Sequence, residues 1–424
     1  MTFPRGRKYL QALFVLAISP TAVLAAGAEV TLDSSLPAVP TGLLASHAAF
    51  FGGTVLGETS YGTVYQLVPP AKAGQSWTDK FVYVFDNYGD QGGLLVAPLI
   101  SDKAGNLFGS TFGGGVNGQP RGTGNGTLFK LIPPSASQTS WSRQVVYLFQ
   151  TPVAPQVKLA MDASGNLYLP SGSNVLQFTP PSSGSGTYTM TPISMLTGFM
   201  SDNTSSVILD RFGKIYGVAQ SIGTSSPVYD IIYQLTPPSA PGGQWTSRIL
   251  QSFAPNAHVG QLGLSPNGRL FGTTNPVGVG CAAVNCAVFE LVQGVKGSWT
   301  TQIVHSFAGD PLGVPASNLA HQTYVPNDYQ LSFAAGGLIY GGILPAPSQA
   351  SDNSTIYRLT PPASGQSAWT ETALYTFQGA PNGFRAGTPM TIAGNGAVYG
   401  TAYGGQQMSG SNLLQSIAFK IVGH

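Results

Sequence analysis

The chain has 424 residues, of which only 8% are charged and 42% are hydrophobic, and its formal net charge is +2. The 18 basic residues stand singly along the chain. A nucleic-acid binder needs Lys and Arg gathered on one face to neutralise phosphates, so we expect no nucleic-acid partner. The 55 Gly and 32 Pro residues, beside an ample apolar fraction, indicate many turns and argue against disorder.

The N-terminal segment has the pattern of a secretory signal peptide over 1–26. Basic residues within 5–8 precede an apolar run over 9–18, and the small residues of AVLAAGA supply a cleavage site. The apolar run is shorter than the roughly 20 residues that span a bilayer as a helix, so we expect no membrane anchor after cleavage. The predicted mature protein, 27–424, is a single domain and a monomer, periplasmic or secreted.

One phrase recurs along the chain, as DKAGNLFG at 102, DASGNLYL at 162, DRFGKIYG at 210, PNGRLFG at 266 and GNGAVYG at 394. In D-x-x-G-N the carboxylate accepts backbone N–H groups while the Gly takes a positive φ, which predicts a tight hairpin. Calcium is the other reading of this motif. One carboxylate falls well short of the roughly 6–8 oxygens that Ca²⁺ takes, so a turn is favoured.

Each phrase is followed by a Gly-rich stretch and then by an alternating run: TVYQL at 63, TLFKL at 127, NVLQF at 174, IIYQL at 231, AVFEL at 287, TIYRL at 355 and IAFKI at 417. In five of these seven copies Pro-Pro comes next, which cannot donate to a strand ladder and so ends the strand. A fourth run such as WSRQVVYLF completes the unit. All five tryptophans occupy its first position. A Trp cluster can be a sugar platform, but one Trp at the same position of each unit is more often a packing residue between units, which is the interpretation we favour.

Four short β runs in each of seven units predict an all-β fold, a β-propeller of seven four-stranded blades. A solenoid is the alternative, but its repeats are usually shorter and need polar caps, and the chain shows neither feature. The last unit lacks its Trp strand, and residues 29–35 are expected to supply it, closing the ring and pairing its edge. The predicted repeats span 41–91, 92–153, 154–200, 201–255, 256–310, 311–380 and 381–424.

The order of GNLFGST at 105, TLFKLI at 127 and WSRQVVYLF at 141 resembles the Gloeo/Verruco (GloVer) tandem repeat of exported bacterial proteins. The resemblance covers nearly the whole mature chain. It implies export and a repeat architecture, and it brings no reaction with it. The third repeat departs most, because Leu169 replaces the motif glycine and Tyr188 stands near the Trp position.

The sequence carries no H-E-x-x-H, G-x-S-x-G, P-loop or paired-Cys zinc motif. The stretch GGGVNG at 113 matches G-x-G-x-x-G by letter, but it opens no predicted helix and is therefore no dinucleotide site. The histidines are scattered over unlike repeat positions: His258 begins an innermost strand, His47 lies within another, and His305 lies inside an outer strand. We therefore predict no catalytic residue, no metal and no cofactor.

The two cysteines, Cys281 and Cys286, lie five apart in one loop. Two thiols with no nearby His cannot complete a tetrahedral zinc site, and an exported chain favours a disulfide. We expect this bridge to fix the shape of the loop more than to stabilise the ring.

The long loops between second and third strands, at 111–126, 275–285, 343–354 and 402–412, are expected to crowd one face of the propeller together with the links between blades. Function commonly lies on such variable loops over a rigid scaffold. The residues predicted to bind a ligand on or beside that face are Asp86, Asp90, Arg121, Asn125, Asp230, His258, Asp352, Arg385 and Tyr403.

Two functions are compatible with this pattern. The favoured one is an exported, non-catalytic binding or interaction propeller for a carbohydrate or a protein, because the loops are neutral and rich in Gly, Asn and Tyr. The alternative is a propeller enzyme, a lyase or lactonase-like hydrolase with an Asp/His/metal centre at the channel mouth. Three titratable groups converging there would favour the enzyme, but the chain has only 16 acidic residues to offer.

Overall fold

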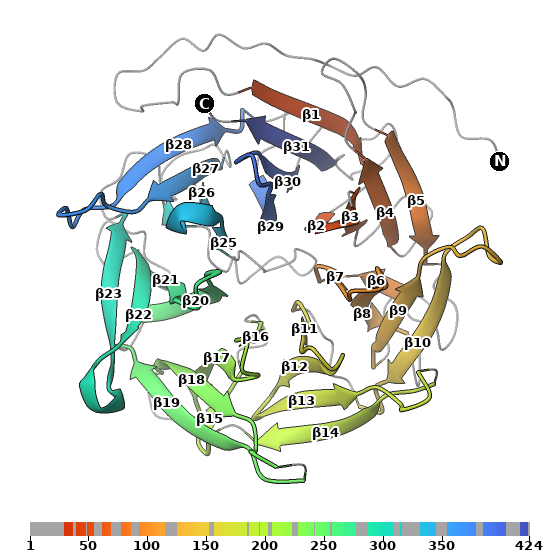
Figure 1. Cartoon of the computed structure of the whole chain (residues 1–424), viewed down its shortest axis with the longest axis horizontal. Coiled ribbons are helices and arrows are strands. Elements are labelled where there is room, and N and C mark those ends of the chain that lie inside the picture. The colour runs from red at the N-terminus through yellow and green to blue at the C-terminus, as the bar shows by residue number, and fades with distance from the viewer. Residues whose placement is uncertain are drawn as a thin grey trace.

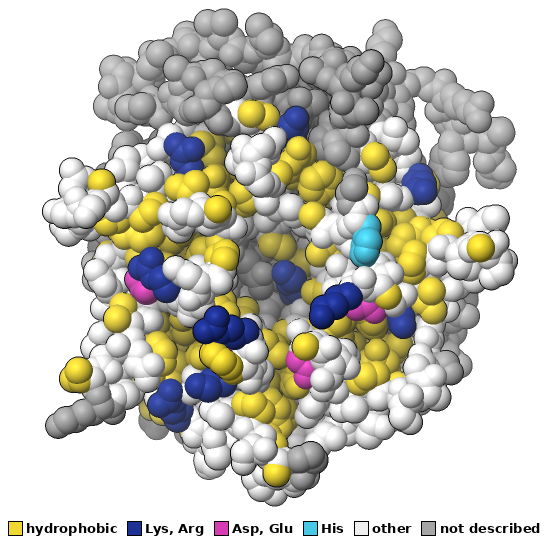
Figure 2. Space-filling model, in the orientation of Figure 1, with side chains coloured by type: hydrophobic (Ala, Val, Ile, Leu, Met, Phe, Trp, Pro, Cys, Tyr) yellow, Lys and Arg dark blue, Asp and Glu magenta, His cyan; other side chains and the backbone are white. Residues whose placement is uncertain are grey.

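The computed structural model is a ring of seven antiparallel β-sheets (Figure 1), and its surface is hollowed at the centre of the ring, here called the channel (Figure 2). This confirms the predicted seven-bladed β-propeller. The structure describes residues 29–36, 40–47, 49–54, 62–68, 78–85, 93–95, 97–114, 125–151, 157–184, 186–194, 196–201, 206–222, 228–240, 242–254, 257–276, 287–307, 314–315, 331–344, 354–378, 385–403 and 416–422. No helix in these ranges is long and apolar enough to cross a bilayer.

The first three blades, each given from the channel outward, follow the chain. The first holds β2 (Pro40–Ser46), β3 (Ala49–Thr54), β4 (Thr63–Val68) and β5 (Thr78–Val84). The second holds β6 (Gly93–Leu95) with β7 (Ile100–Ser101), then β8 (Leu107–Gly113), β9 (Thr127–Ile132) and β10 (Ser142–Leu148). The third holds β11 (Ala160–Met161), β12 (Leu167–Ser171), β13 (Asn174–Thr179) and β14 (Thr189–Ser194). The atypical third repeat therefore forms a full blade.

The remaining blades repeat this order. The fourth holds β15 (Phe199–Met200) with β16 (Ile208–Leu209), then β17 (Ile215–Ser221), β18 (Asp230–Thr236) and β19 (Thr246–Ser252). The fifth holds β20 (Ala257–Leu264), β21 (Leu270–Pro276), β22 (Ala287–Gln293) and β23 (Trp299–Ser306), with the 3₁₀ turn η2 (Val295–Gly297) between the last two. The sixth holds β24 (Val314–Pro315) with β25 (Ser332–Phe333), then β26 (Ile339–Leu344), β27 (Thr355–Thr360) and β28 (Thr370–Thr376), and η3 (Ala335–Gly337) precedes β26.

The seventh blade combines the two ends of the chain. It holds β29 (Arg385–Ile392), β30 (Val398–Tyr403) and β31 (Ser416–Val422), and its outermost strand is β1 (Glu29–Leu36). The strands β1 and β31 run antiparallel, with Glu29 opposite Val422 and Leu32 opposite Phe419. In Figure 1 the first strand lies along the outside of the last one.

Two expectations about single segments change. The strand β15 pairs with β17 in the fourth blade, although the boundary drawn at residue 200 places it in the third repeat. His47 does not lie within an innermost strand. It occupies the turn between β2 and β3 with a φ of 48°, where the chain reverses without the aspartate that holds the equivalent turns at Asp102, Asp162 and Asp210.

The D-x-x-G turns have the predicted chemistry. Asp102 Oδ1 accepts the backbone N–H groups two and four residues on, at 3.0 and 2.9 Å, and its Oδ2 accepts from Asn106 Nδ2 at 2.7 Å. Gly105 takes a φ of 81°. The backbone bonds recur at Asp162 and Asp210. These carboxylates accept backbone N–H groups within their own turns and so hold the hairpins, as predicted from the chemistry of turns.

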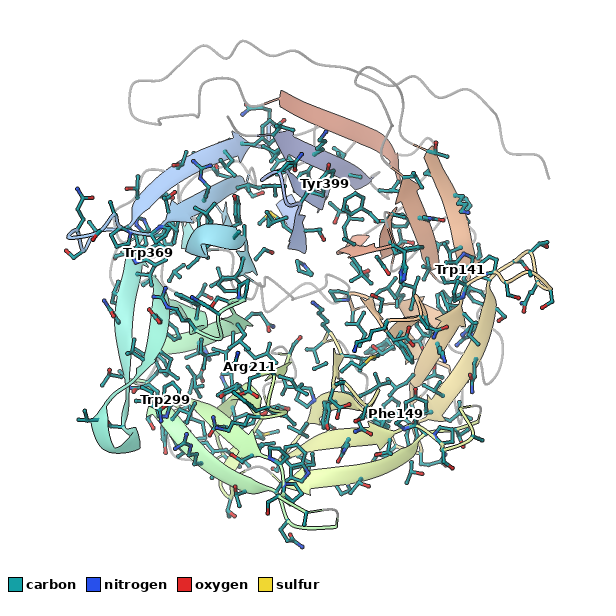
Figure 3. The ribbon with its side chains drawn as sticks, viewed as in Figure 1. Trp141, Phe149, Arg211, Trp299, Trp369 and Tyr399 are labelled. Atoms are coloured by element: carbon teal, nitrogen blue, oxygen red, sulfur yellow. The ribbon has the colours of Figure 1, made fainter. Side chains whose placement is uncertain are left out.

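The tryptophans pack between blades, as predicted from their single repeat position. Trp141, Trp245 and Trp369 each stand just before a fourth strand and meet an aromatic ring on the second strand of the preceding blade, and Trp299 packs against the core cluster that contains Tyr216. The ring centroids are 5.6 Å apart for Trp141 and Phe51, 6.2 Å for Trp245 and Tyr168, and 6.5 Å for Trp369 and Phe271. Figure 3 shows Trp141, Trp299 and Trp369 where neighbouring blades meet.

Tyr188 takes the tryptophan's place in the third blade. Its ring packs against the core cluster that contains Phe108, the second-strand aromatic of the preceding blade. The smaller ring still bridges two blades, which explains how the third repeat dispenses with a tryptophan.

The motif glycine on the second strand makes room for an aromatic ring on the third. A Cβ built on Gly217 would lie 2.4 Å from the hydroxyl of Tyr233, the residue directly opposite it. Gly109 stands in the same relation to Phe129, with a distance of 2.6 Å to its Cζ atom. The third blade has Leu169 opposite Leu176 instead. In the third blade two leucines thus fill the space that a glycine and an aromatic ring fill in the other two blades.

Buried tyrosines make the fold sensitive to alkali. Burial and the charge of Asp210, to which its hydroxyl donates at 3.1 Å, raise the pKa of Tyr216 to about 12. An unfolded tyrosine has a pKa of about 10. Because the folded state holds the proton more tightly, this stabilisation is complete below the unfolded pKa and is lost as pH rises through the folded one.

We therefore expect the melting temperature to fall between pH ~10 and ~12. Circular dichroism melts across this interval measure the fall, and tyrosinate absorbance checks that it accompanies ionisation. Tyr216→Phe, which has no proton to lose, should lose less stability over the same range. An equal fall in the variant would contradict a role for Tyr216.

Candidate functional site

Two of the predicted ligand residues meet at the junction of the fourth and fifth blades. Asp230 is the first residue of β18, on the long-loop side of its blade, and His258 is the second residue of β20, the innermost strand of the next blade. Figure 1 shows β20 on the inner rim of the ring. Gln220, near the end of β17, lies directly opposite Asp230 in the strand register. The side chains of Gln220, Asp230 and His258 therefore lie together near the channel, although they come from three different strands.

The carboxylate of Asp230 is buried and holds the histidine. Its side chain is only 2% exposed, and its Oδ2 accepts the backbone N–H of Val259 at 2.8 Å and lies 3.1 Å from His258 Nδ1. The same ring nitrogen lies 3.1 Å from Gln220 Nε2. The adjacent carboxylate favours a proton on Nδ1, and the Gln220 amide can turn its oxygen toward that proton. The half-exposed imidazole, 37% accessible, is thus held in one orientation.

The arrangement combines three kinds of hydrogen-bonding group: a carboxylate, an imidazole and an amide. Within the described ranges no three His, Cys, Asp or Glu side chains gather as a metal site would require. The described part of this cluster contributes two titratable groups, Asp230 and His258. The site can offer several donors and acceptors to a polar ligand, and its carboxylate stays fixed within the protein.

The other predicted residues are more dispersed. Asn125 is buried just before β9, and its Nδ2 makes no hydrogen bond to any described residue. Arg385 and Tyr403 are opposite each other in the register of β29 and β30, in the seventh blade. The remaining predicted residues, Asp86, Asp90, Arg121, Cys281, Cys286 and Asp352, lie outside the described residues.

Sequence reasoning missed Gln220. It stands at a strand end that the repeat pattern does not distinguish, and only the cross-strand register with Asp230 shows its role. The sequence does contain a signal for Gln220. The loop at 222–229 joins two antiparallel strands, so residues beside its two ends, Gln220 and Asp230, must lie close together.

No family model and no curated protein matches the chain. Solved structures do resemble it. A 6-phosphogluconolactonase candidate from Bacteroides uniformis is 12% identical, with a TM-score of 0.47 over 89% of this chain and 95% of its own. A gluconolactonase from Xanthomonas campestris is 13% identical, with a TM-score of 0.38 over 70% and 79% of the two chains.

A third similar structure is the calcium-binding protein regucalcin from Agrobacterium tumefaciens, which is 12% identical. Its TM-score is 0.40, over 77% of this chain and 90% of its own. All three identities are too low to show more than a shared fold, and all three TM-scores lie below 0.5. Functional inference therefore depends on the residues of this chain.

Proposed function

We propose that the protein is an exported, non-catalytic binding propeller that takes a carbohydrate or a protein as its ligand on the long-loop face. The cluster of Asp230, His258 and Gln220 carries the proposal. It lies beside the channel on the side where the second-to-third loops emerge, and it places fixed donors and acceptors at a partly exposed position. Export and membership of the GloVer repeat family are parts of the same proposal, and both rest on the sequence.

Binding is favoured over catalysis by the composition of this cluster. Asp230 is buried and committed to Val259 and His258, so it supports the ring and is poorly placed to act on a substrate. Gln220 has no titratable proton. Of the described residues in this cluster, His258 is then the exposed titratable group, whereas acid–base chemistry on a substrate generally needs a nucleophile, or an acid and a base together.

A glycan array and a pull-down with the mature chain, 27–424, test the proposal. We expect His258→Gln to weaken binding of the ligand found by on the order of tenfold, because an oriented donor or acceptor is lost. His47→Gln, in an exposed turn of the first blade, is the matched control and should bind normally. Equal binding by the His258 variant and the unaltered chain would place the ligand elsewhere.

An oriented Asp–His pair also occurs where histidine acts as a general base, and this observation supports the enzyme as the second candidate. Lactone hydrolysis by the mature chain, followed as acid release, separates the two. Turnover that is lost in His258→Gln and kept in His47→Gln would favour the enzyme, and its absence would favour the binding protein.

A further inference from the structure

A cavity lies at the junction of the fifth and sixth blades, on the side of the hairpin turns. Its volume is about 410 Å³, within the range of roughly 300–1,000 Å³ that small-molecule sites occupy. The fifth blade contributes Arg269, Glu290 and Gln302, and the sixth contributes Gln366, Ser367 and Trp369. Glu290 and Gln302 are opposite each other on β22 and β23, so neighbouring strands present them side by side.

A neutral ion pair forms one wall of this cavity. Arg269 donates from Nε to Glu290 Oε1 at 2.6 Å and from Nη2 to Oε2, in a two-pronged contact. The guanidinium also lies 5.1 Å from the ring centroid of Phe271. These hydrogen bonds to Glu290 raise the pKa of Arg269. An anionic or a cationic ligand would have to break this contact, so the electrostatics favour a ligand without charge.

An apolar wall faces the pair. It consists of Trp369 with Pro361 and Pro362, which begin the turn of the sixth blade. Trp369 stands edge-on to Phe271, with an angle of 79° between the rings, and the turn is closed by the Gln366 N–H donating to the Ala363 carbonyl at 2.9 Å. Figure 3 shows Trp369 between the two blades. The aromatic surface is therefore fixed in place before any ligand arrives.

The polar groups at the rim both donate and accept hydrogen bonds. Gln302 and Gln366 are exposed amides, and Ser367 is an exposed hydroxyl. Hydroxyl groups of a ligand also do both, whereas a carboxylate only accepts and an ammonium only donates. A sugar ring combines such hydroxyls with an apolar C–H face that fits an aromatic surface. We propose that this cavity binds a neutral saccharide, with a sugar ring against Trp369 and its hydroxyls bonded to the two glutamines.

The fifth blade has the residues for such a wall, and the second, third and fourth blades do not. The position of Arg269 holds Asn106, Asn166 and Lys214 in the second, third and fourth blades, and that of Glu290 holds Lys130, Gln177 and Gln234. None of these pairs is an arginine with a carboxylate. Trp245 has the packing role of Trp369 but faces a blade with Asn166 and Gln177, which makes it a matched control.

Calorimetric titration with neutral hexose disaccharides, and with glucuronate and inorganic phosphate as charged probes, tests the inference. We expect heat with a neutral disaccharide only. Trp369→Leu should weaken that binding at least about tenfold, as loss of an anchoring aromatic does, while Trp245→Leu loses a similar packing contact and binds normally. If Trp369→Leu fails to fold, Gln302→Ala with Gln366→Ala replaces it, since both side chains are exposed. Equal weakening by Trp369→Leu and Trp245→Leu would overturn the inference.

The inference goes beyond the loop-face site and does not depend on it. His258→Gln should bind the disaccharide normally. Loss of binding in that variant but not in Trp369→Leu would overturn the inference and support the loop-face proposal. The absence of heat with any neutral saccharide would overturn the inference, and so would tighter binding of glucuronate or phosphate. Neither result would overturn the loop-face proposal, because that proposal also allows a protein ligand and has its own test.

Discussion

Gly217→Leu should destabilise the protein severely, and a second substitution opposite it should recover much of the loss. The added side chain would collide with the ring of Tyr233, whose Cζ lies 2.5 Å from the position of a Cβ on Gly217. Tyr233 is 1% exposed and enclosed by its blade, so the ring has no space to withdraw into. Overpacking of a core typically costs about 1–3 kcal/mol, and we expect this site to lie at the upper end because the ring cannot move aside. Urea unfolding gives the change in the free energy of unfolding.

The third blade supplies the design of the compensating variant. Because Leu169 and Leu176 occupy the equivalent positions, the double variant Gly217→Leu/Tyr233→Leu reproduces a pair that the chain already uses. We expect it to be more stable than Gly217→Leu, and Tyr233→Leu alone to lose stability through the cavity that it leaves. The four proteins form a double-mutant cycle. Additive effects within about 0.5 kcal/mol would show that glycine and ring are not coupled.

Removal of β1 is expected to have the other large effect. A chain that begins at residue 37 leaves the outer edge of β31 unpaired, from Ser416 to Val422, and an open edge recruits other strands. We expect a lower melting temperature together with self-association, measured by scanning calorimetry and sedimentation velocity. A chain that begins at Glu29 keeps the strand and serves as the control. If both chains melt and sediment alike, β1 does not hold the seventh blade.

The sequence allowed the blades to be predicted because the signals that define them are local and repeated. The Asp102 turn is built within five residues, and Pro-Pro ends a third strand by its own chemistry. Such signals can be recognised within a single repeat, because they do not depend on contacts with neighbouring repeats. His47 shows the limit of this approach, since its turn contains neither Asp nor Gly and the sequence pattern therefore predicts a strand there.

Contacts between blades could not be predicted in the same way. Asp230 and His258 were both singled out for the loop face, yet their meeting depends on how two sheets are set against each other, and Gln220 joins them only through the register of β17 and β18. The pairing of Arg269 with Glu290 likewise needs the register of β21 and β22, which is fixed by the whole blade. Local patterns do not contain this information.

The surface in Figure 2 also depends on this arrangement. On the face shown there, Lys and Arg side chains of the described residues lie as separate spots with apolar and uncharged surface between them. The single basic residues of the sequence thus stay apart on this face after folding. A neutral ligand suits such a surface better than a polyanion, whose binding depends on many adjacent cations.

The tryptophan contacts make their junctions directional. At Trp141, Trp245 and Trp369 the fourth strand of one blade meets the second strand of the blade before it. This is a head-to-tail contact between unlike surfaces, which in a set of separate subunits would produce either an endless filament or a closed ring, according to the rotation at each step. Here the rotation is one seventh of a turn. A chain with one blade added or removed would therefore have to re-pack every junction, so the number of repeats cannot change one unit at a time as it can in a rod of stacked repeats.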